Sequence, residues 1–161
     1  MDQFGIHLII ILHLHNFNMK KLINKINNYW SNLENDNSVY GFQILKNTTW
    51  NNKAYTKQEI DFFEEQNKLL LPVDFVEFLL LITGIKNEQY DFKNNMFKQN
   101  WVFNISSIDK YKINTKFVNL LKKVGIFLDK DDILVRLYGY RFLVCNKNIK
   151  YKTSKILSIM S

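Results

Sequence analysis

The stretch TKQEIDFFEEQNKLLLPVDFVEFLLLITG, residues 56–84, decides the fold because it combines helix start and stop signals with the densest apolar pattern in the chain. Thr56 followed by Glu59 matches a capping box, in which a hydroxyl and a carboxylate satisfy unpaired N–H groups at a helix start. The helix that begins there should end near Asn67. Pro72 fixes φ near the helical value and has no N–H, so it suits the first turn of a second helix.

The second helix, predicted from Pro72 to Gly84, is apolar over most of its circumference. Its two apolar stripes follow helical spacing and consist of Phe75, Phe78, Leu79 and Ile82 on one side and Val73, Val76 and Leu80 on the other. Such a helix should be buried, with only the side that carries Asp74 and Glu77 facing water. Gly84 tolerates positive φ and should end it.

Before this stretch, apolar residues between positions 20 and 33 recur every three or four residues, which predicts an amphipathic helix. Residues 34–55 are rich in Asn, Asp and Ser and should form a loop, with a short extended piece at 42–45. After it, residues 86–100 are polar and should be irregular.

The C-terminal half begins with a predicted short strand at 101–105. Ser106 or Ser107 could cap a helix over 108–124 that ends at Gly125. Branched and aromatic runs at 133–138, 140–145 and 156–160 then predict strands. Helices first and strands later indicate an α+β fold, in which N-terminal helices pack on a largely antiparallel C-terminal sheet.

The 161 residues fit a single domain, which we assign to 19–161. Residues 1–18 hold an apolar run at 6–14 that is too short to span a bilayer, with no basic residue ahead of it. Since Met19 could be a natural start, we interpret 1–18 as an appended or non-native extension. No membrane association is expected, and a single cysteine, Cys145, fits a reducing cytoplasm.

The residue types argue against an enzyme. The histidines, His7, His13 and His15, all precede Met19, so the body of the chain has no imidazole for acid–base chemistry near neutral pH. His13 and His15 could share a metal, but no carboxylate or thiol nearby completes the set. Cys145 lies in an apolar run, and the five glycines are too far apart for a phosphate loop. We expect no cofactor, no metal and no catalytic residue.

Acidic residues are concentrated on the two predicted helices. The densest group consists of Glu59, Asp61, Glu64, Glu65, Asp74 and Glu77. Paired acids could in principle hydrolyse a substrate, but helical periodicity favours the water-facing side of two packed helices. These residues are therefore the candidate partner-binding face for a basic protein.

Basic residues dominate the other half, because residues 93–161 carry fourteen basic and four acidic side chains in a chain of net charge +7. Near the C-terminus, cations and aromatic rings are mixed as in single-stranded nucleic-acid sites, at Tyr138, Tyr140, Arg141, Lys147, Lys150, Tyr151, Lys152 and Lys155. An edge strand whose lysines discourage pairing explains the same pattern better. Arg141 could equally pair with Asp74. Nucleic-acid binding stays the less favoured alternative.

Two motifs resemble the SUKH superfamily. The first follows the acidic helix and consists of Leu71, Pro72, Asp74, Phe75, Phe78, Leu79 and Gly84. The second is ILVRLYGYRFLVC, residues 133–145, followed by KILSIMS, residues 155–161. It is similar to a strand ending in Gly-His-Arg and to the final strand of one branch of that family. Gly139 and Arg141 match, whereas Tyr140 replaces the histidine. The resemblance spans residues 22–161, and these motif residues are structural.

The resemblance implies a non-enzymatic protein-binding module. Within this family, the resemblance implies an immunity protein that binds a cognate toxin, often a nuclease. Such a protein covers the active site or the substrate path of the toxin. A cell-wall or signalling regulatory adaptor of the Smi and Knr type is the alternative. The net charge of +7 departs from the acidic surfaces with which immunity proteins meet basic nucleases.

Overall fold

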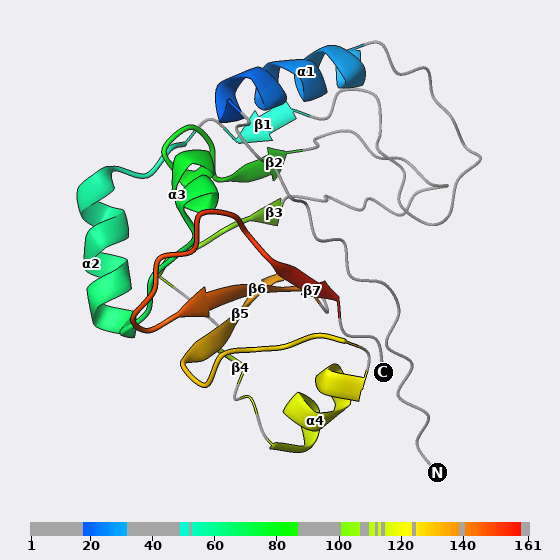
Figure 1. Ribbon diagram of the computed structural model, residues 1–161. Helices are drawn as coiled ribbons and strands as arrows, with labels where there is room; N and C mark the ends of the chain where they lie inside the picture. Colours follow the sequence, from blue (N-terminus) through cyan, green and yellow to red (C-terminus); the bar gives the residue numbers. More distant parts are fainter. Residues whose placement is uncertain are drawn as a thin grey trace, which may run out of the picture. The chain divides into compact units, whose positions relative to one another are not determined.

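The computed structural model describes residues 18–31, 49–51, 53–86, 101–106, 110–111, 113, 115–123, 125–138 and 141–158 (Figure 1). The fold is α+β, as predicted. The chain divides into two compact units. The first contains Lys57–Val76 and the described part of Asn104–Ser161, and the second contains the described parts of Asn16–Thr56 and Glu77–Phe103. The assignment of 19–161 to a single domain stays a prediction.

An antiparallel sheet of four strands forms the centre of the first unit (Figure 1). Its strands, in spatial order, are β4 (Lys110–Tyr111), β5 (Asp132–Tyr138), β6 (Arg141–Asn146) and β7 (Ile156–Ser158). Leu134 of β5 lies opposite Val144 of β6, and Leu143 lies opposite Ile156 of β7. The branched runs therefore form the predicted C-terminal strands. β6 is a central strand whose residues from Phe142 onward are all buried, as expected for a strand covered on both faces.

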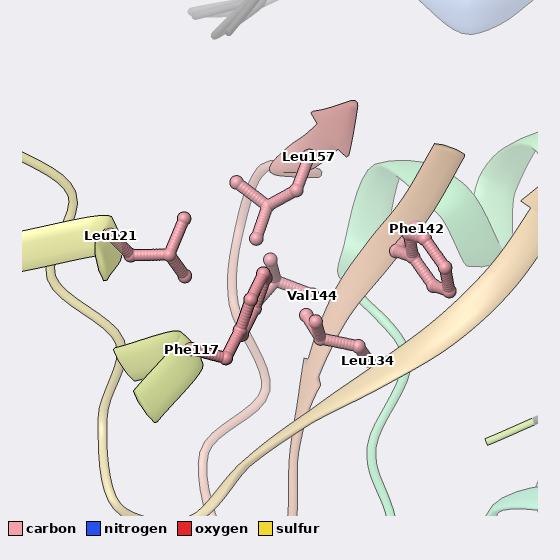
Figure 2. Close-up of a cluster of buried hydrophobic side chains, with 6 residues drawn as sticks. All are labelled: Phe117, Leu121, Leu134, Phe142, Val144 and Leu157. Atoms are coloured by element: carbon pink, nitrogen blue, oxygen red, sulfur yellow. The ribbon is translucent and has the colours of Figure 1, made fainter. Parts of the chain in front are cut away.

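Helix α4 (Thr115–Lys123) covers one face of this sheet. Figure 2 shows the buried cluster between them, which consists of Phe117, Leu121, Leu134, Phe142, Val144 and Leu157. Phe117 and Leu121 are four residues apart and so project from the same side of α4. The helix ends in a Schellman motif at Gly125, whose φ is 80°. There the Gly125 N–H donates to the Lys122 carbonyl and the Ile126 N–H to the Leu121 carbonyl.

Helix α2 (Lys57–Asn67) begins directly after Thr56 and ends where the capping and periodicity signals predicted. It too ends in a Schellman motif, with the Leu69 N–H donating to the Glu64 carbonyl and the Lys68 N–H to the Glu65 carbonyl. Lys68 occupies the left-handed position, with a φ of 51°. This conformation is costly for a residue that has a Cβ.

Helix α3 (Val73–Leu79) starts after Pro72, as predicted, but is shorter than predicted. Leu80 and Leu81 form a turn and are partly exposed, and Gly84 opens strand β2 (Gly84–Lys86), so it does not cap the helix. The turn is closed by two hydrogen bonds, because the N–H groups of Leu81 and Ile82 both donate to the Phe78 carbonyl. Val73 is also exposed, which corrects the expectation that only the Asp74 and Glu77 side meets water.

The second unit contains α1 (Met19–Ser31) and an antiparallel sheet ordered β1 (Thr49–Asn51), β2 and β3 (Trp101–Val102). The amphipathic helix and the strand at Trp101 are confirmed, the strand being shorter than predicted. Asn18 caps α1, because its Oδ1 accepts the Lys21 N–H at 3.1 Å. Trp50 of β1 packs edge-on against Phe78, with ring centroids 6.3 Å apart.

Two further predictions, one in each unit, were wrong. Residues 49–51 were expected to be a loop and form β1, and the helix expected over 108–124 starts only at Thr115, with β4 preceding it. The predictions for 42–45 and for the extension up to residue 17 lie outside the described residues, as does all but the first residue of 86–100.

Candidate protein-binding site

The exposed side of α2 carries a phenylalanine among acids. Phe62 is 63% exposed, while Ile60 and Phe63 on the opposite side of the helix are buried. Glu59 and Glu65 lie three residues before and after Phe62, so all three share one side of the helix. Asp61 is also exposed and forms an ion pair with Lys57. We call Glu59, Asp61, Phe62 and Glu65 the α2 surface.

A pocket of about 360 Å³ lies beside the α2 surface. Its lining residues come from α2, from the segment that follows it and from the residue after β6, and are Asp61, Glu64, Glu65, Lys68, Leu69, Leu70 and Lys147. The α2 surface is therefore hollowed at its edge. An apolar side chain of a partner could enter there between charged groups.

Glu64 does not belong to the exposed acidic face predicted from the sequence. It is only 7% exposed, and its Oε1 accepts the Leu71 N–H at 2.8 Å. Nζ of Lys150 lies 2.9 Å from Oε1 and 3.0 Å from Oε2 of the same carboxylate. A buried carboxylate must be paired or hydrogen-bonded, and Glu64 is both. It therefore joins the segment after α2 to the loop between β6 and β7.

Asp74 is likewise used inside the molecule. Its Oδ2 accepts the Ser154 N–H at 2.8 Å, and its Oδ1 accepts the Ser154 hydroxyl at 2.7 Å. The partner of Asp74 is thus a serine and not Arg141, which is exposed on β6. Glu77 is exposed on α3 but falls in the other compact unit. Of the six predicted acids, Glu59, Asp61 and Glu65 are exposed on α2. Asp61 and Glu65, four residues apart, share one side of the helix, whereas Glu59 lies on the other side of Phe62.

Sequence reasoning missed the polar group centred on Asn146. This residue is fully buried, and its backbone pairs with that of Leu70 in both directions. Its Nδ2 donates to Asp132 Oδ1 at 2.9 Å, and the Tyr151 hydroxyl donates to the same oxygen at 2.7 Å. Its Oδ1 accepts the N–H groups of Asn148 and Ile149. An asparagine that starts a turn was the available signal, but its long-range partners leave no trace in the local sequence.

Most of the described residues of the SUKH-like motifs are buried or half-buried, whereas Arg141 is exposed. Leu71, Pro72, Phe75, Leu79 and Gly84 are buried, and Phe78 is half-buried. Gly139 lies outside the described residues. The structural role of the motif residues stays a prediction.

Two titratable groups of the first unit, Cys145 and Tyr151, have raised pKa values. Burial, together with the charges of Glu64 and Asp132, raises the pKa of the Cys145 thiol far above its ordinary range. Burial and the hydrogen bond to Asp132 raise the pKa of Tyr151 to about 12. Burial therefore keeps the Cys145 thiol protonated and unreactive at neutral pH. Within the described residues, no cluster of three or more His, Cys, Asp or Glu side chains is arranged to hold a metal ion.

Part of the basic and aromatic group near the C-terminus is committed to internal contacts. Lys150 pairs with Glu64, and the Tyr151 hydroxyl donates to Asp132. Nζ of Lys155 lies 4.9 Å from the centroid of the Tyr151 ring. Lys147 and Lys152 are exposed, and the side chains of Tyr138 and Tyr140 are outside the described part of the chain. The one ring of this group that is described is therefore already covered by a cation of the same chain.

Comparisons of the chain with models of known families, with curated proteins and with solved structures found no match. Among the described helices, none has the length and apolar character needed to cross a membrane.

Proposed function

We propose that this chain is a non-enzymatic protein-binding module of the SUKH type that acts as an immunity protein and neutralises a cognate toxin. The observation that carries the proposal is Phe62, an aromatic side chain left 63% exposed among acids on a well-formed helix. Aromatic residues at the centre of an interface contribute much of its binding energy, and surrounding charges select the partner.

The chemistry of the α2 surface defines the partner. Glu59, Asp61 and Glu65 favour a basic protein surface, and Phe62 favours an apolar depression within it. The net charge of +7 does not oppose this contact, because association depends on the local charge of the facing patches. A specific complex would bury about 800 Å² on each partner, so residues around α2 must contribute as well.

Co-expression of the chain with the product of the adjacent gene tests the proposal. We expect a stoichiometric complex on size-exclusion chromatography and restored growth of cells that the product alone would kill. Phe62→Ala should weaken the complex and the rescue. Phe127→Ala is a matched control, because Phe127 is 72% exposed but lies in the segment after α4, away from the α2 surface in sequence.

Each outcome of the co-expression bears on the proposal. Absence of both complex and rescue contradicts it, and so does an equal loss of rescue with Phe127→Ala and Phe62→Ala. A complex without rescue would favour the regulatory adaptor of the Smi and Knr type.

A further inference from the structure

A second hollow of the first unit lies along α4. It has a volume of about 620 Å³, within the range of small-molecule sites. One wall consists of Thr115, Val118, Asn119 and Lys122, which follow the spacing of a single helix side. The other lining residues are Lys110, Ile113, Leu128, Asp129, Lys130, Asp132, Ile133 and Lys147. We call this hollow the α4 groove.

The α4 groove combines aliphatic and cationic side chains. Four branched residues, Ile113, Val118, Leu128 and Ile133, are only half-buried there and leave apolar surface open to a ligand. Four exposed lysines, Lys110, Lys122, Lys130 and Lys147, lie among them. Lys110 donates to the Asn67 carbonyl, whereas in the described part of the chain Lys122, Lys130 and Lys147 have no ion-pair partner.

The two acids of the groove offset only half of the charge of its four lysines. Asp132 is buried, and its Oδ1 accepts hydrogen bonds from Asn146 and Tyr151 while its Oδ2 accepts the Asp129 N–H at 2.8 Å. Asp129 Oδ1 accepts the Asp131 N–H. Both carboxylates are therefore held by neighbouring N–H and O–H groups, and the groove retains a formal excess of two positive charges.

We propose that the α4 groove binds a small aliphatic carboxylate, with its chain along the branched residues and its head group at the lysines. The described lining contains no aromatic side chain, so the groove lacks the stacking surface that single-stranded nucleic acid requires. This inference does not rest on the proposed function, because none of Glu59, Asp61, Phe62 and Glu65 lines the groove. Lys147 alone lines both the groove and the pocket beside the α2 surface.

Calorimetric titration with octanoate, acetate and 1-octanol tests the proposal. We expect octanoate to bind more tightly than acetate, which lacks the chain, and than 1-octanol, which lacks the charge. In amide NMR spectra of the whole chain, octanoate should shift the signals of Val118, Asn119, Leu128 and Ile133. Equal binding of the three probes, no binding of octanoate, or shifts confined to other residues would overturn the proposal.

Three variants locate the binding energy. Lys122→Ala combined with Lys130→Ala should raise the octanoate Kd roughly three- to tenfold, because each removes one partly screened charge contact. Lys53→Ala combined with Lys152→Ala changes the net charge equally at exposed residues outside the groove and should leave the Kd unchanged. Asn119→Glu adds a carboxylate at an exposed groove position and should also weaken binding. Equal effects of the two lysine pairs contradict the proposal.

Discussion

Lys150 and Glu64 are 86 positions apart in the chain, yet the Lys150 ammonium lies within 3.0 Å of both oxygens of the buried Glu64 carboxylate. The same carboxylate accepts the Leu71 N–H directly before Pro72. A single acid therefore fixes both the end of the α2–α3 connection and the loop between β6 and β7. Glu64 lies on the same helix as the α2 surface, so the junction also fixes the position of that surface.

Lys150→Met should destabilise the fold by about 1–2 kcal/mol. It removes the charge but retains the apolar stem, and it leaves a buried carboxylate without its cation. The cost stays below that of a fully buried pair because one-third of the Lys150 side chain is exposed to water. Urea unfolding measures the difference, and a double-mutant cycle with Glu64→Gln isolates the pair. A coupling energy near zero would show that the ion pair does not hold the junction.

Stability should fall as the pH rises from about 10 to 12. The pKa of Tyr151 is raised in the folded state from 10.0 to about 12, so the folded state holds this proton more tightly than the unfolded state does. Its contribution is complete below pH 10 and is lost as the pH approaches 12. Unfolding free energies between pH 9 and 12 measure this loss. Tyr151→Phe should remove the part of the pH dependence that comes from Tyr151. An identical pH dependence in Tyr151→Phe would contradict the assignment.

The Cys145 thiol should be inert in the native protein. It is fully buried, and its pKa is raised by burial and by the nearby carboxylates, so almost no thiolate exists at pH 8. Its reaction with a disulfide reagent such as DTNB should wait for unfolding and accelerate in urea. Rapid stoichiometric labelling of folded protein would show instead that the thiol is accessible.

Substitutions at the C-terminal ends of α2 and α4 should have opposite effects on stability. Lys68→Gly should stabilise the protein by about 1 kcal/mol, because glycine adopts the left-handed conformation at φ 51° without the Cβ penalty. Gly125→Ala should destabilise it by about the same amount. A Cβ at Gly125 would meet no atom within 4 Å, so the cost there is conformational. Thermal unfolding of both variants checks the signs, and changes of the same sign would contradict this account of the Schellman motifs.

Local signals in the sequence were sufficient where a few adjacent residues determine the structure. Thr56 and Pro72 correctly marked the starts of α2 and α3, and Gly125 marked the end of α4. Strand β4 has two residues and β1 has three, too few to show an alternating pattern. Both depend on hydrogen bonds to distant strands, which is why the sequence favoured a helix and a loop at these positions.

The candidate site was predicted in part. Helical periodicity placed Glu59, Asp61 and Glu65 on the exposed side of α2, but it assumed the same for Glu64 because carboxylates are rarely buried. Its burial depends on Lys150, a tertiary partner that no local pattern reveals. Phe62 was overlooked for the opposite reason, since an apolar residue in a helix is normally assigned to the core.

The measurement that tests the central claim most directly is the affinity of two variants for the product of the adjacent gene. Phe62→Ala should raise the Kd about 30-fold, equivalent to roughly 2 kcal/mol, as expected for a central aromatic contact. Phe127→Ala removes a ring of similar exposure. It should leave the Kd within about twofold of that of the unmodified chain, because substitutions at an exposed position outside the contact have small effects. Equal affinities of both variants and the unmodified chain would show that the α2 surface does not bind the partner.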